Sequence, residues 1–316
     1  MQAVILGAGK GTRLHPITLK RSKAMAPIAG RPMAARVMDL FIQQDIRDFI
    51  LVVSPQDQEI RSYFETEVGL DVMIRFVVQE ERLGMAHALS LAAPYLGETF
   101  ILSACDNLVP GEHVAELIAR HQMEQARATL SLMEIEPAAA SRTAVVDWGA
   151  GEIRRIVEKP GPDEVISTIA SLPLYIFSPQ LLTYLPQVKR SARGEYELQE
   201  AIQLLIEQEG GVTGVLTPRR LQLTNADDLL KLNRHYLTVE GKQLQVRPDQ
   251  IGPQSCLAAP VRIEAGTIIG AGCVIGPRVY IERDCRIGAN VLIRDALILR
   301  NTIVEEGRQV MGEVVG

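Results

Sequence analysis

The 316-residue sequence predicts an α/β fold with a Rossmann-like, mostly parallel sheet, followed by a short left-handed parallel β-helix. Two patterns carry this prediction. Apolar runs alternate with helical patterns up to about residue 240, and beyond it an aliphatic residue recurs at every sixth position. We therefore expect two domains, over residues 1–240 and 241–316.

The composition excludes several classes of protein. With 47% hydrophobic residues the chain can bury a large core, and its four cysteines show no CxxC spacing that would suggest zinc or a disulfide framework. A net charge of −5 and 4% aromatic residues argue against a nucleic-acid partner. No apolar stretch reaches the roughly 18 residues that cross a bilayer, so we expect a cytoplasmic protein without a membrane partner.

Short apolar runs in the first half of the chain are typical of buried strands. Because they are separated by helices that begin near Gln56 and Met85, they indicate a parallel sheet covered on both faces. Ligands of such sheets bind beyond the carboxyl ends of the strands. The predicted strands are 3–6, 49–53, 72–78 and 100–103.

A basic, glycine-rich loop follows the first predicted strand. Residues 7–13 read GAGKGTR, and the first 38 residues contain seven lysines and arginines with no acidic residue before Asp39. Glycines let backbone N–H groups approach phosphate oxygens closely. The segment from Leu6 to Lys23 therefore predicts a binding loop for a nucleoside triphosphate.

Two common phosphate-binding motifs do not fit this loop. A dinucleotide-binding fingerprint would place glycine at Thr12 and an acid at the end of the second strand, where the chain has Ser54 and Pro55. A Walker loop would need Gly-Lys-Ser/Thr five residues after its first glycine, and neither Gly7 nor Gly9 supplies it.

A longer string fits a third motif. Residues 6–16 (LGAGKGTRLHP), with Lys23, Pro27 and the GRP of 30–32, resemble the signature of the sugar-phosphate nucleotidyltransferases, and the resemblance extends more weakly over the whole chain. It implies an enzyme that joins a pyrimidine nucleoside triphosphate, dTTP or UTP, to glucose 1-phosphate or N-acetylglucosamine 1-phosphate with Mg²⁺. The nucleotide contacts that it implies are Leu6, Gly7, Ala8, Gly9, Gly11 and Thr12.

The resemblance also implies catalytic residues and a base site. Arg13 would hold the departing β,γ-phosphates and Lys23 the α-phosphate, and Asp106, at the end of an apolar strand, would hold Mg²⁺. Gln79 would pair with the imide edge of uracil or thymine, and Gly84 with Met85 would lie beside the ring.

Sugar-phosphate contacts are implied around the string 156–160 (IVEKP). Glu158 would accept hydrogen bonds from sugar hydroxyls and Lys159 would neutralise the sugar phosphate. Ala144 and Ser171 stand where the family has other sugar contacts, and Gln222 stands where it has a second metal ligand.

Three departures from the family pattern keep an alternative open. They are Cys105 before the metal aspartate, Pro173 in the sugar segment and Gln222 at the second metal position. They favour a second hypothesis, a regulatory protein of the same fold that binds a nucleotide sugar without making it.

The six-residue repeat predicts the β-helix. One aliphatic residue per flat turn lines a triangular coil, and a short solenoid caps itself by packing on a neighbouring domain or subunit, so a homo-oligomer is expected. An acyltransferase is disfavoured because all five histidines precede the repeat. The aliphatic positions are Ile251, Leu257, Ile263, Ile269, Ile275, Ile281, Ile287, Ile293 and Leu299.

Overall fold

The computed structural model describes residues 1–66 and 71–316 and divides into two compact units. The first unit holds Met1–Lys10, Ser22–Met25 and Ala34–Leu221. The second holds Gly11–Arg21, Ala26–Met33 and Gln222–Gly316. These units do not coincide with the predicted ranges, because the unit that contains the coils also includes two N-terminal segments and a long helix.

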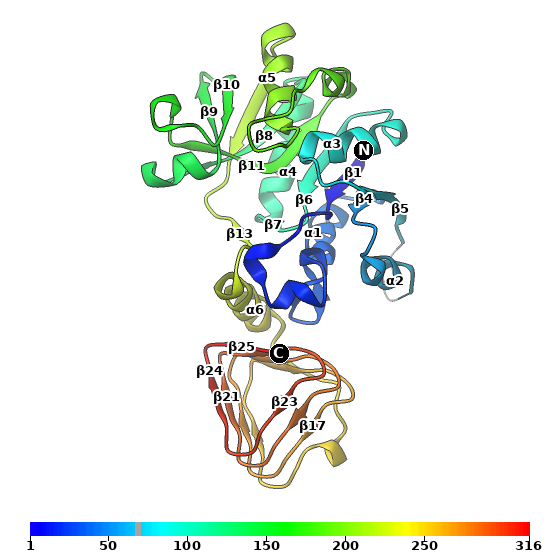
Figure 1. Cartoon of the computed structure of the whole chain (residues 1–316), viewed down its shortest axis with the longest axis vertical. Coiled ribbons are helices and arrows are strands. Elements are labelled where there is room, and N and C mark those ends of the chain that lie inside the picture. The colour runs from blue at the N-terminus through cyan, green and yellow to red at the C-terminus, as the bar shows by residue number, and fades with distance from the viewer. Residues whose placement is uncertain (67–70) are drawn as a thin grey trace. The chain divides into compact units, whose positions relative to one another are not determined.

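A nine-stranded sheet forms the centre of the first unit, in the order β5-β4-β1-β6-β11-β8-β12-β10-β9 (Figure 1). Only β11 and β10 run against the other seven strands, so the predicted mostly parallel sheet is confirmed. The strands are β1 (Gln2–Leu6), β4 (Asp48–Val53), β5 (Met73–Val78), β6 (Phe100–Ala104), β8 (Ala128–Glu134), β9 (Ala144–Gly149), β10 (Glu152–Glu158), β11 (Ile169–Phe177) and β12 (Val212–Leu216), with the short strand β7 (Asn107–Leu108) after β6.

Helices cover this sheet because their small and aliphatic residues face it. Leu89 of α3 and Ile202 of α5 share a buried cluster with Val4 and Val52 of the sheet. On α4, the buried rings of His113 and His121 bond to hydroxyls of β8. The helices are α1 (Met33–Ile42), α2 (Gln58–Thr66), α3 (Met85–Ala92), α4 (Gly111–Met123) and α5 (Leu198–Gln208).

The carboxyl ends of four parallel strands meet at one edge of the sheet. Leu6 at the end of β1 pairs with Val52 on one side and with Ala104 on the other, and Val53 pairs with Val78. The residues that follow these strands therefore emerge at a common edge, where the sequence predicts the ligand.

The second unit contains a parallel β-helix with three sheets, β14-β16-β19-β22-β25, β15-β18-β21-β24 and β17-β20-β23 (Figure 1, orange to red). Its core contains the predicted aliphatic residues from Ile263 to Ile293, and Ile251 and Leu257 are partly buried against them. The strands are β14 (Lys242–Leu244), β15 (Cys256–Leu257), β16 (Val261–Ile263), β17 (Ile268–Ile269), β18 (Val274–Ile275), β19 (Val279–Ile281), β20 (Arg286–Ile287), β21 (Leu292–Arg294), β22 (Leu297–Ile298), β23 (Ile303–Val304), β24 (Gln309–Met311) and β25 (Val314–Val315).

Two turns of the β-helix are a residue shorter than the repeat predicts. Corners carry a left-handed residue at every sixth position from Gly266 to Asn290, but the next one is Asp295, and a second five-residue step separates Gly307 from Gly312. Ile281 consequently pairs with Ile298, which is fully buried, and Leu299 lies outside the core column. The prediction that Leu299 continues the column is therefore wrong.

The helix α6 (Ala226–Glu240) completes the second unit and begins at a defined cap. The side chain of Asn225 accepts a 2.9 Å hydrogen bond from the backbone N–H of Asp228. This bond gives a partner to one of the N–H groups in the first turn, which have none within the helix. The hairpin strands β2 (Pro27–Ile28) and β3 (Arg31–Pro32) belong to the same unit, and β13 (Leu221–Gln222) lies at the boundary of the two units. Among the described residues, no helix combines the length and apolarity that a bilayer span requires.

Candidate active site

The first half of the glycine-rich loop leaves the sheet directly after β1. The backbone N–H of Gly7 donates to the carbonyl of Val52 at 2.7 Å, and a Cβ on Gly7 would lie 3.3 Å from the same oxygen. Gly9 differs, because a Cβ there would meet no described atom within 4 Å. Packing against the described residues therefore does not account for glycine at position 9, and its contact with a nucleotide stays a prediction.

The second half of the loop belongs to the second unit and folds into tight turns. Gly11 has φ 63° and precedes a 3₁₀ turn at Thr12–Leu14 that carries Arg13. The hydroxyl of Thr18 donates to the carbonyl of Gly11 at 2.8 Å, which closes the loop on itself. Arg13 is exposed, and its contact with a triphosphate stays a prediction.

Lys23 and Asp106 are brought together at the carboxyl edge of the sheet. Asp106 follows β6, and its carboxylate forms an ion pair with the ammonium of Lys23. The two side chains are 14% and 19% exposed. Two of the predicted catalytic residues therefore lie in direct contact.

Arg220 adds a second cation near Asp106 that the sequence analysis did not select. Its Nε donates to Oδ1 of Asn107 at 2.6 Å. Burial lowers the pKa of the Arg220 guanidinium, and the Asp106 carboxylate opposes that shift. The only signal in the sequence was the position of Arg220, two residues before Gln222.

Asp57 is a second acidic residue that the sequence analysis missed. It follows β4 and is buried, and it accepts a 3.3 Å hydrogen bond from the backbone of Ile60. Burial raises the pKa of Asp57, and a hydrogen bond from Ser22, next to Lys23, opposes the shift. No motif marks Asp57, because only folding brings it beside the segment that carries Lys23.

Cys105 is buried directly before Asp106. Burial, and then the Asp106 carboxylate, raise the pKa of its thiol to about 12, so the thiol stays protonated at neutral pH. The departure from the family pattern at this position thus places a small, inert side chain next to Asp106.

Gln79 is buried where β5 ends, and its amide nitrogen lies between two polar groups. Its Nε2 donates to the carbonyl of Gly84 at 3.2 Å and lies 3.1 Å from Nδ1 of His87. When Nδ1 of His87 is the unprotonated ring nitrogen, both amide hydrogens have acceptors, and the carbonyl oxygen of Gln79 is left as an acceptor.

Gly84 is required by the backbone that it contacts. It has φ 103° before α3, and a Cβ would lie 2.6 Å from the carbonyl oxygen of Tyr196. Packing against Tyr196 therefore explains this glycine in full. Met85 begins α3, and the contact of both residues with a base stays a prediction.

Three of the four predicted sugar-phosphate residues lie on adjacent strands, and the fourth, Lys159, directly follows β10. Ala144 at the start of β9 pairs with Glu158 of β10 and with Ser171 of β11. Lys159 has φ 46°, which turns its ammonium back to 3.2 Å from Glu158 Oε1. Burial raises the pKa of Glu158, and the Lys159 ammonium opposes that shift. The sheet thus gathers residues that the sequence spreads over 28 positions.

The donor set at the sheet edge suits a magnesium ion that is completed by substrate. Among the described residues, no three His, Cys, Asp or Glu side chains cluster as a protein-only metal site. Asp106 offers one carboxylate, and Mg²⁺ takes one or two carboxylates together with phosphate oxygens and water. Gln222 is exposed and belongs to the other unit, so its role as a metal ligand stays a prediction.

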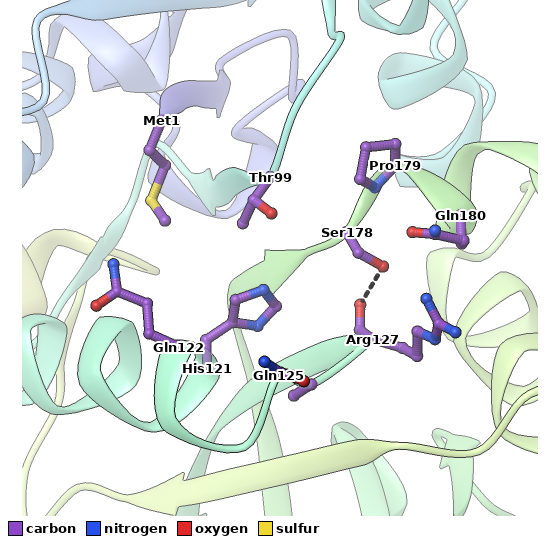
Figure 2. Close-up of a pocket in the computed structure, with 10 residues that line it drawn as sticks. Met1, Thr99, His121, Gln122, Gln125, Arg127, Ser178, Pro179 and Gln180 are labelled. Carbon is purple, nitrogen blue, oxygen red and sulfur yellow. Dashed lines mark hydrogen bonds between the residues drawn. The ribbon is translucent and has the colours of Figure 1, made fainter.

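Two pockets of the structure lie apart from the predicted residues. One, of about 450 Å³, is lined by residues at the opposite edge of the sheet, including Met1, Thr99 and Arg127, whose carbonyl accepts a 2.9 Å hydrogen bond from Ser178 (Figure 2). The other, of about 650 Å³, lies in the second unit and is lined by residues such as Lys20 and Arg308. Neither contains a predicted site residue.

The family of the chain follows from comparison with known proteins. The model of the nucleotidyl transferase family matches residues 2–238, and a model described as the GMPPB C-terminal domain matches residues 257–316. The chain therefore belongs to the nucleotidyl transferase family, and the prediction of a sugar-phosphate nucleotidyltransferase enzyme is confirmed at this level.

Curated relatives carry related names. A UTP–glucose-1-phosphate uridylyltransferase, AglF of Haloferax volcanii, is 34% identical over 65% of this chain and 84% of its own length. A glucose-1-phosphate thymidylyltransferase of Streptomyces griseus is 27% identical over 100% of this chain and 92% of its own. The bifunctional protein GlmU of Brevibacillus brevis is 29% identical over 100% of this chain and 70% of its own.

Solved structures support the fold. A UDP-glucose pyrophosphorylase complexed with UDP-glucose aligns with a TM-score of 0.68 over 75% of this chain and 98% of its own, at 19% identity. A UDP-glucose pyrophosphorylase from Acinetobacter baumannii aligns with a TM-score of 0.66 over 74% and 92%, at 22% identity.

Proposed function

We propose that this protein transfers a nucleotidyl group from UTP or dTTP to a sugar 1-phosphate, either glucose 1-phosphate or N-acetylglucosamine 1-phosphate. The observation that carries the proposal is the ion pair of Lys23 and Asp106 beside the strand end that leads into the glycine loop. The names of the relatives support the substrate class, and the fold supports the position of the site.

The proposed reaction needs no covalent intermediate. An oxygen of the sugar 1-phosphate attacks the α-phosphorus in line, the bond to the β-phosphate oxygen breaks, and pyrophosphate leaves. Lys23 would orient the α-phosphate, Arg13 would bind the departing phosphates, and Glu158 with Lys159 would bind the sugar phosphate. Positioning and charge neutralisation supply most of the catalysis in such transfers.

Asp106 would hold a magnesium ion. When bound, that ion neutralises negative charge on the phosphates. Lys23 would then give up its contact with Asp106 and bind phosphate instead, because one ammonium cannot satisfy both groups at full strength.

The side chain of Gln79 favours binding of a base that carries a ring N–H. When its amide hydrogens are directed at Gly84 and His87, its carbonyl oxygen can accept from the N3–H of uracil or thymine. Cytosine presents an acceptor at the same ring position, so we propose that CTP is a poor substrate.

Pyrophosphate release tests the proposal. The purified chain is incubated with Mg²⁺, each of UTP, dTTP, CTP, GTP and ATP, and several sugar 1-phosphates. The expected result is turnover with UTP or dTTP that is lost in Arg13→Ala and Asp106→Ala. A blank matrix together with tight binding of a nucleotide sugar would instead support the regulatory protein of the same fold.

Assembly and location belong to the same proposal. We infer a homo-oligomer that works in the cytoplasm, where nucleoside triphosphates are supplied. Light scattering of the purified chain measures the first, and fractionation of cells that express it measures the second.

A further inference from the structure

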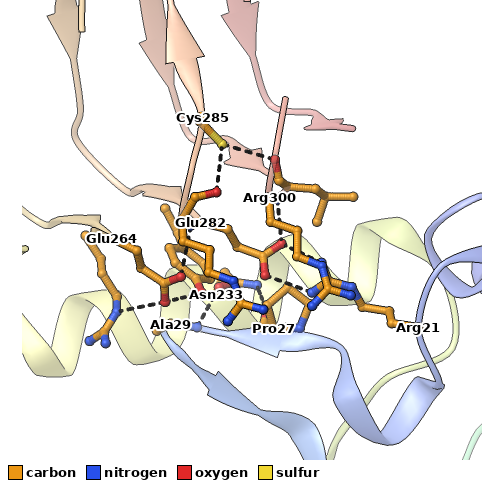
Figure 3. Close-up of polar contacts among 12 residues, drawn as sticks. Arg21, Pro27, Ala29, Asn233, Glu264, Glu282, Cys285 and Arg300 are labelled. Carbon is orange, nitrogen blue, oxygen red and sulfur yellow. Dashed lines mark hydrogen bonds and ion pairs between the residues drawn. The ribbon is translucent and has the colours of Figure 1, made fainter. Parts of the chain in front are cut away.

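A buried ion pair joins residues 11–21, here called the nucleotide-loop segment, to the β-helix within the second unit (Figure 3). The guanidinium of Arg21 donates to both carboxylate oxygens of Glu282, at 2.8 and 3.0 Å. The side chains are only 5% and 7% exposed. Since 261 residues separate the two, this is a contact that only the folded coils can provide.

Contacts within the coils hold Glu282 in place independently of Arg21. One carboxylate oxygen accepts a 3.0 Å hydrogen bond from the backbone N–H of Arg300 on the next coil. The backbone N–H of Glu282 donates to the carbonyl of Ile298, and the backbone carbonyl of Glu282 accepts from the hydroxyl of Thr267. Glu282 therefore presents a carboxylate of fixed position and direction.

The segment that ends at Arg21 is compact enough to transmit this constraint. Two successive 3₁₀ turns, Thr12–Leu14 and Ile17–Leu19, fold it, and Leu14 and Ile17 are buried. The 2.8 Å bond from the Thr18 hydroxyl to the Gly11 carbonyl ties its start to its middle. Arg13 stands on the first of these turns.

Two further contacts fix the neighbouring hairpin in the same unit. The amide of Asn233 on α6 accepts from the N–H of Ala29 at 2.8 Å and donates to the carbonyl of Pro27 at 3.0 Å (Figure 3). A Cβ at Gly30 would lie 2.0 Å from the guanidinium of Arg262, so this turn packs directly on the coil. Chain on both sides of Ser22–Met25 is thus anchored in the second unit.

A buried ion pair is seldom retained for stability alone, because desolvation of both charges offsets most of the attraction. Its geometric effect is more specific, since a bidentate guanidinium–carboxylate pair allows one orientation. We propose that the Arg21–Glu282 pair is a positioning device, through which the β-helix holds Arg13 where it binds the triphosphate. This inference rests on the proposed function for the identity of the ligand.

Hydrogen exchange of the full-length protein tests the pair independently of turnover. Glu282→Gln keeps an acceptor for the Arg300 N–H but loses the charge. The expected result is at least about tenfold faster exchange of amides in 11–21, with unchanged protection in the coils. In parallel, the Kd for UTP with Mg²⁺ should rise about tenfold or more, because a small misplacement of Arg13 weakens its phosphate contact.

Arg278→Gln is the matched control. It breaks the ion pair of Arg278 with Asp295, which lies within the coils and does not involve the nucleotide-loop segment. We expect wild-type exchange of 11–21 and wild-type UTP binding in this variant.

Arg21→Gln removes the same ion pair by a change outside the coils, and it serves as the test if the Glu282 variant does not fold. Arg21→Lys should retain more protection of the amides in 11–21 than Arg21→Gln does. Unchanged exchange of 11–21 in Glu282→Gln or Arg21→Gln, or equal loosening of every coil, would overturn the inference. If the wild-type protein bound no triphosphate, the proposed function would fail, and the exchange data would still decide whether the pair holds the segment.

Discussion

Lys23 and Asp106 form an ion pair at the carboxyl edge of the sheet, with most of both side chains shielded from water. The pair gives each residue a defined place before substrate arrives. Under the proposed function, phosphate and Mg²⁺ would have to replace this contact.

Lys23→Met and Asp106→Asn should each lower kcat/KM for the nucleotidyl transfer by about a hundredfold or more, because each removes charge stabilisation at the reacting phosphate. Pyrophosphate release measures the effect. Thermal unfolding should also report a loss of about 1–3 kcal/mol, since one shielded charge is left without its partner.

Asp147→Asn is the control for this pair. Asp147 is exposed on β9, so its substitution should change neither turnover nor stability appreciably. Full turnover in both site variants would show that the pair takes no part in the reaction.

Gln79→Leu should raise KM for UTP and dTTP by about tenfold, which corresponds to one lost hydrogen bond, and leave KM for the sugar 1-phosphate nearly unchanged. Steady-state kinetics with each substrate varied in turn measure the split. Gln122→Leu makes the same replacement at the pocket on the opposite edge of the sheet and should alter neither value. Equal rises in both KM values for Gln79→Leu would argue against a contact with the base.

Gly84→Ala should destabilise the protein by about 1–3 kcal/mol, because φ of 103° and the carbonyl of Tyr196 both oppose a side chain. Gly97→Ala is the matched replacement, since a Cβ there meets no described atom within 4 Å. Thermal unfolding of the two variants compares them, and equal stability would contradict the packing described for Gly84.

Ile298→Ala should lower the free energy of unfolding by about 2–5 kcal/mol, and Leu299→Ala clearly less, because of these two residues only Ile298 lies in the core of the β-helix. Urea unfolding followed by circular dichroism measures both. The reverse order would restore the unbroken six-residue register that the sequence suggests.

Acid should weaken the fold through His113. Burial lowers the pKa of this side chain from its ordinary value of 6.5 to about 4, so below pH 6.5 the unfolded chain binds a proton that the folded chain excludes. The contribution of neutral His113 to the free energy of unfolding is complete above pH 6.5. It falls by at most about 1.4 kcal/mol per pH unit below that and is lost by about pH 4. Urea unfolding at pH 7, 6 and 5 measures the slope, and His113→Asn should reduce it; equal slopes would contradict the assignment.

Strong local patterns made most of the fold predictable. The strand from Gln2 to Leu6, the helix that begins at Met85 and the coil core around Ile281 each follow from periodicity within a few residues. The short turn before Asp295 was not predictable, since Ile298 and Leu299 are adjacent aliphatic residues and either satisfies the pattern.

The site was predictable only where a motif marks it. Lys23 and Asp106 come from separate motifs, and folding brings them into contact. Asp57 and Arg220 could not be selected, because no motif marks them and only folding brings Asp57 beside Ser22 and Arg220 beside Asn107. The division of the glycine loop between two units has no counterpart in the sequence.

That division has a consequence for synthesis on the ribosome. Residues 11–21 emerge among the first of the chain, yet the carboxylate that pairs with Arg21 is translated 261 residues later. A nascent chain that has completed its sheet therefore still has an unanchored loop and a cation without its partner. Long-range closure of this kind slows folding, so the capacity to bind triphosphate should arise late, after release of the coils from the exit tunnel.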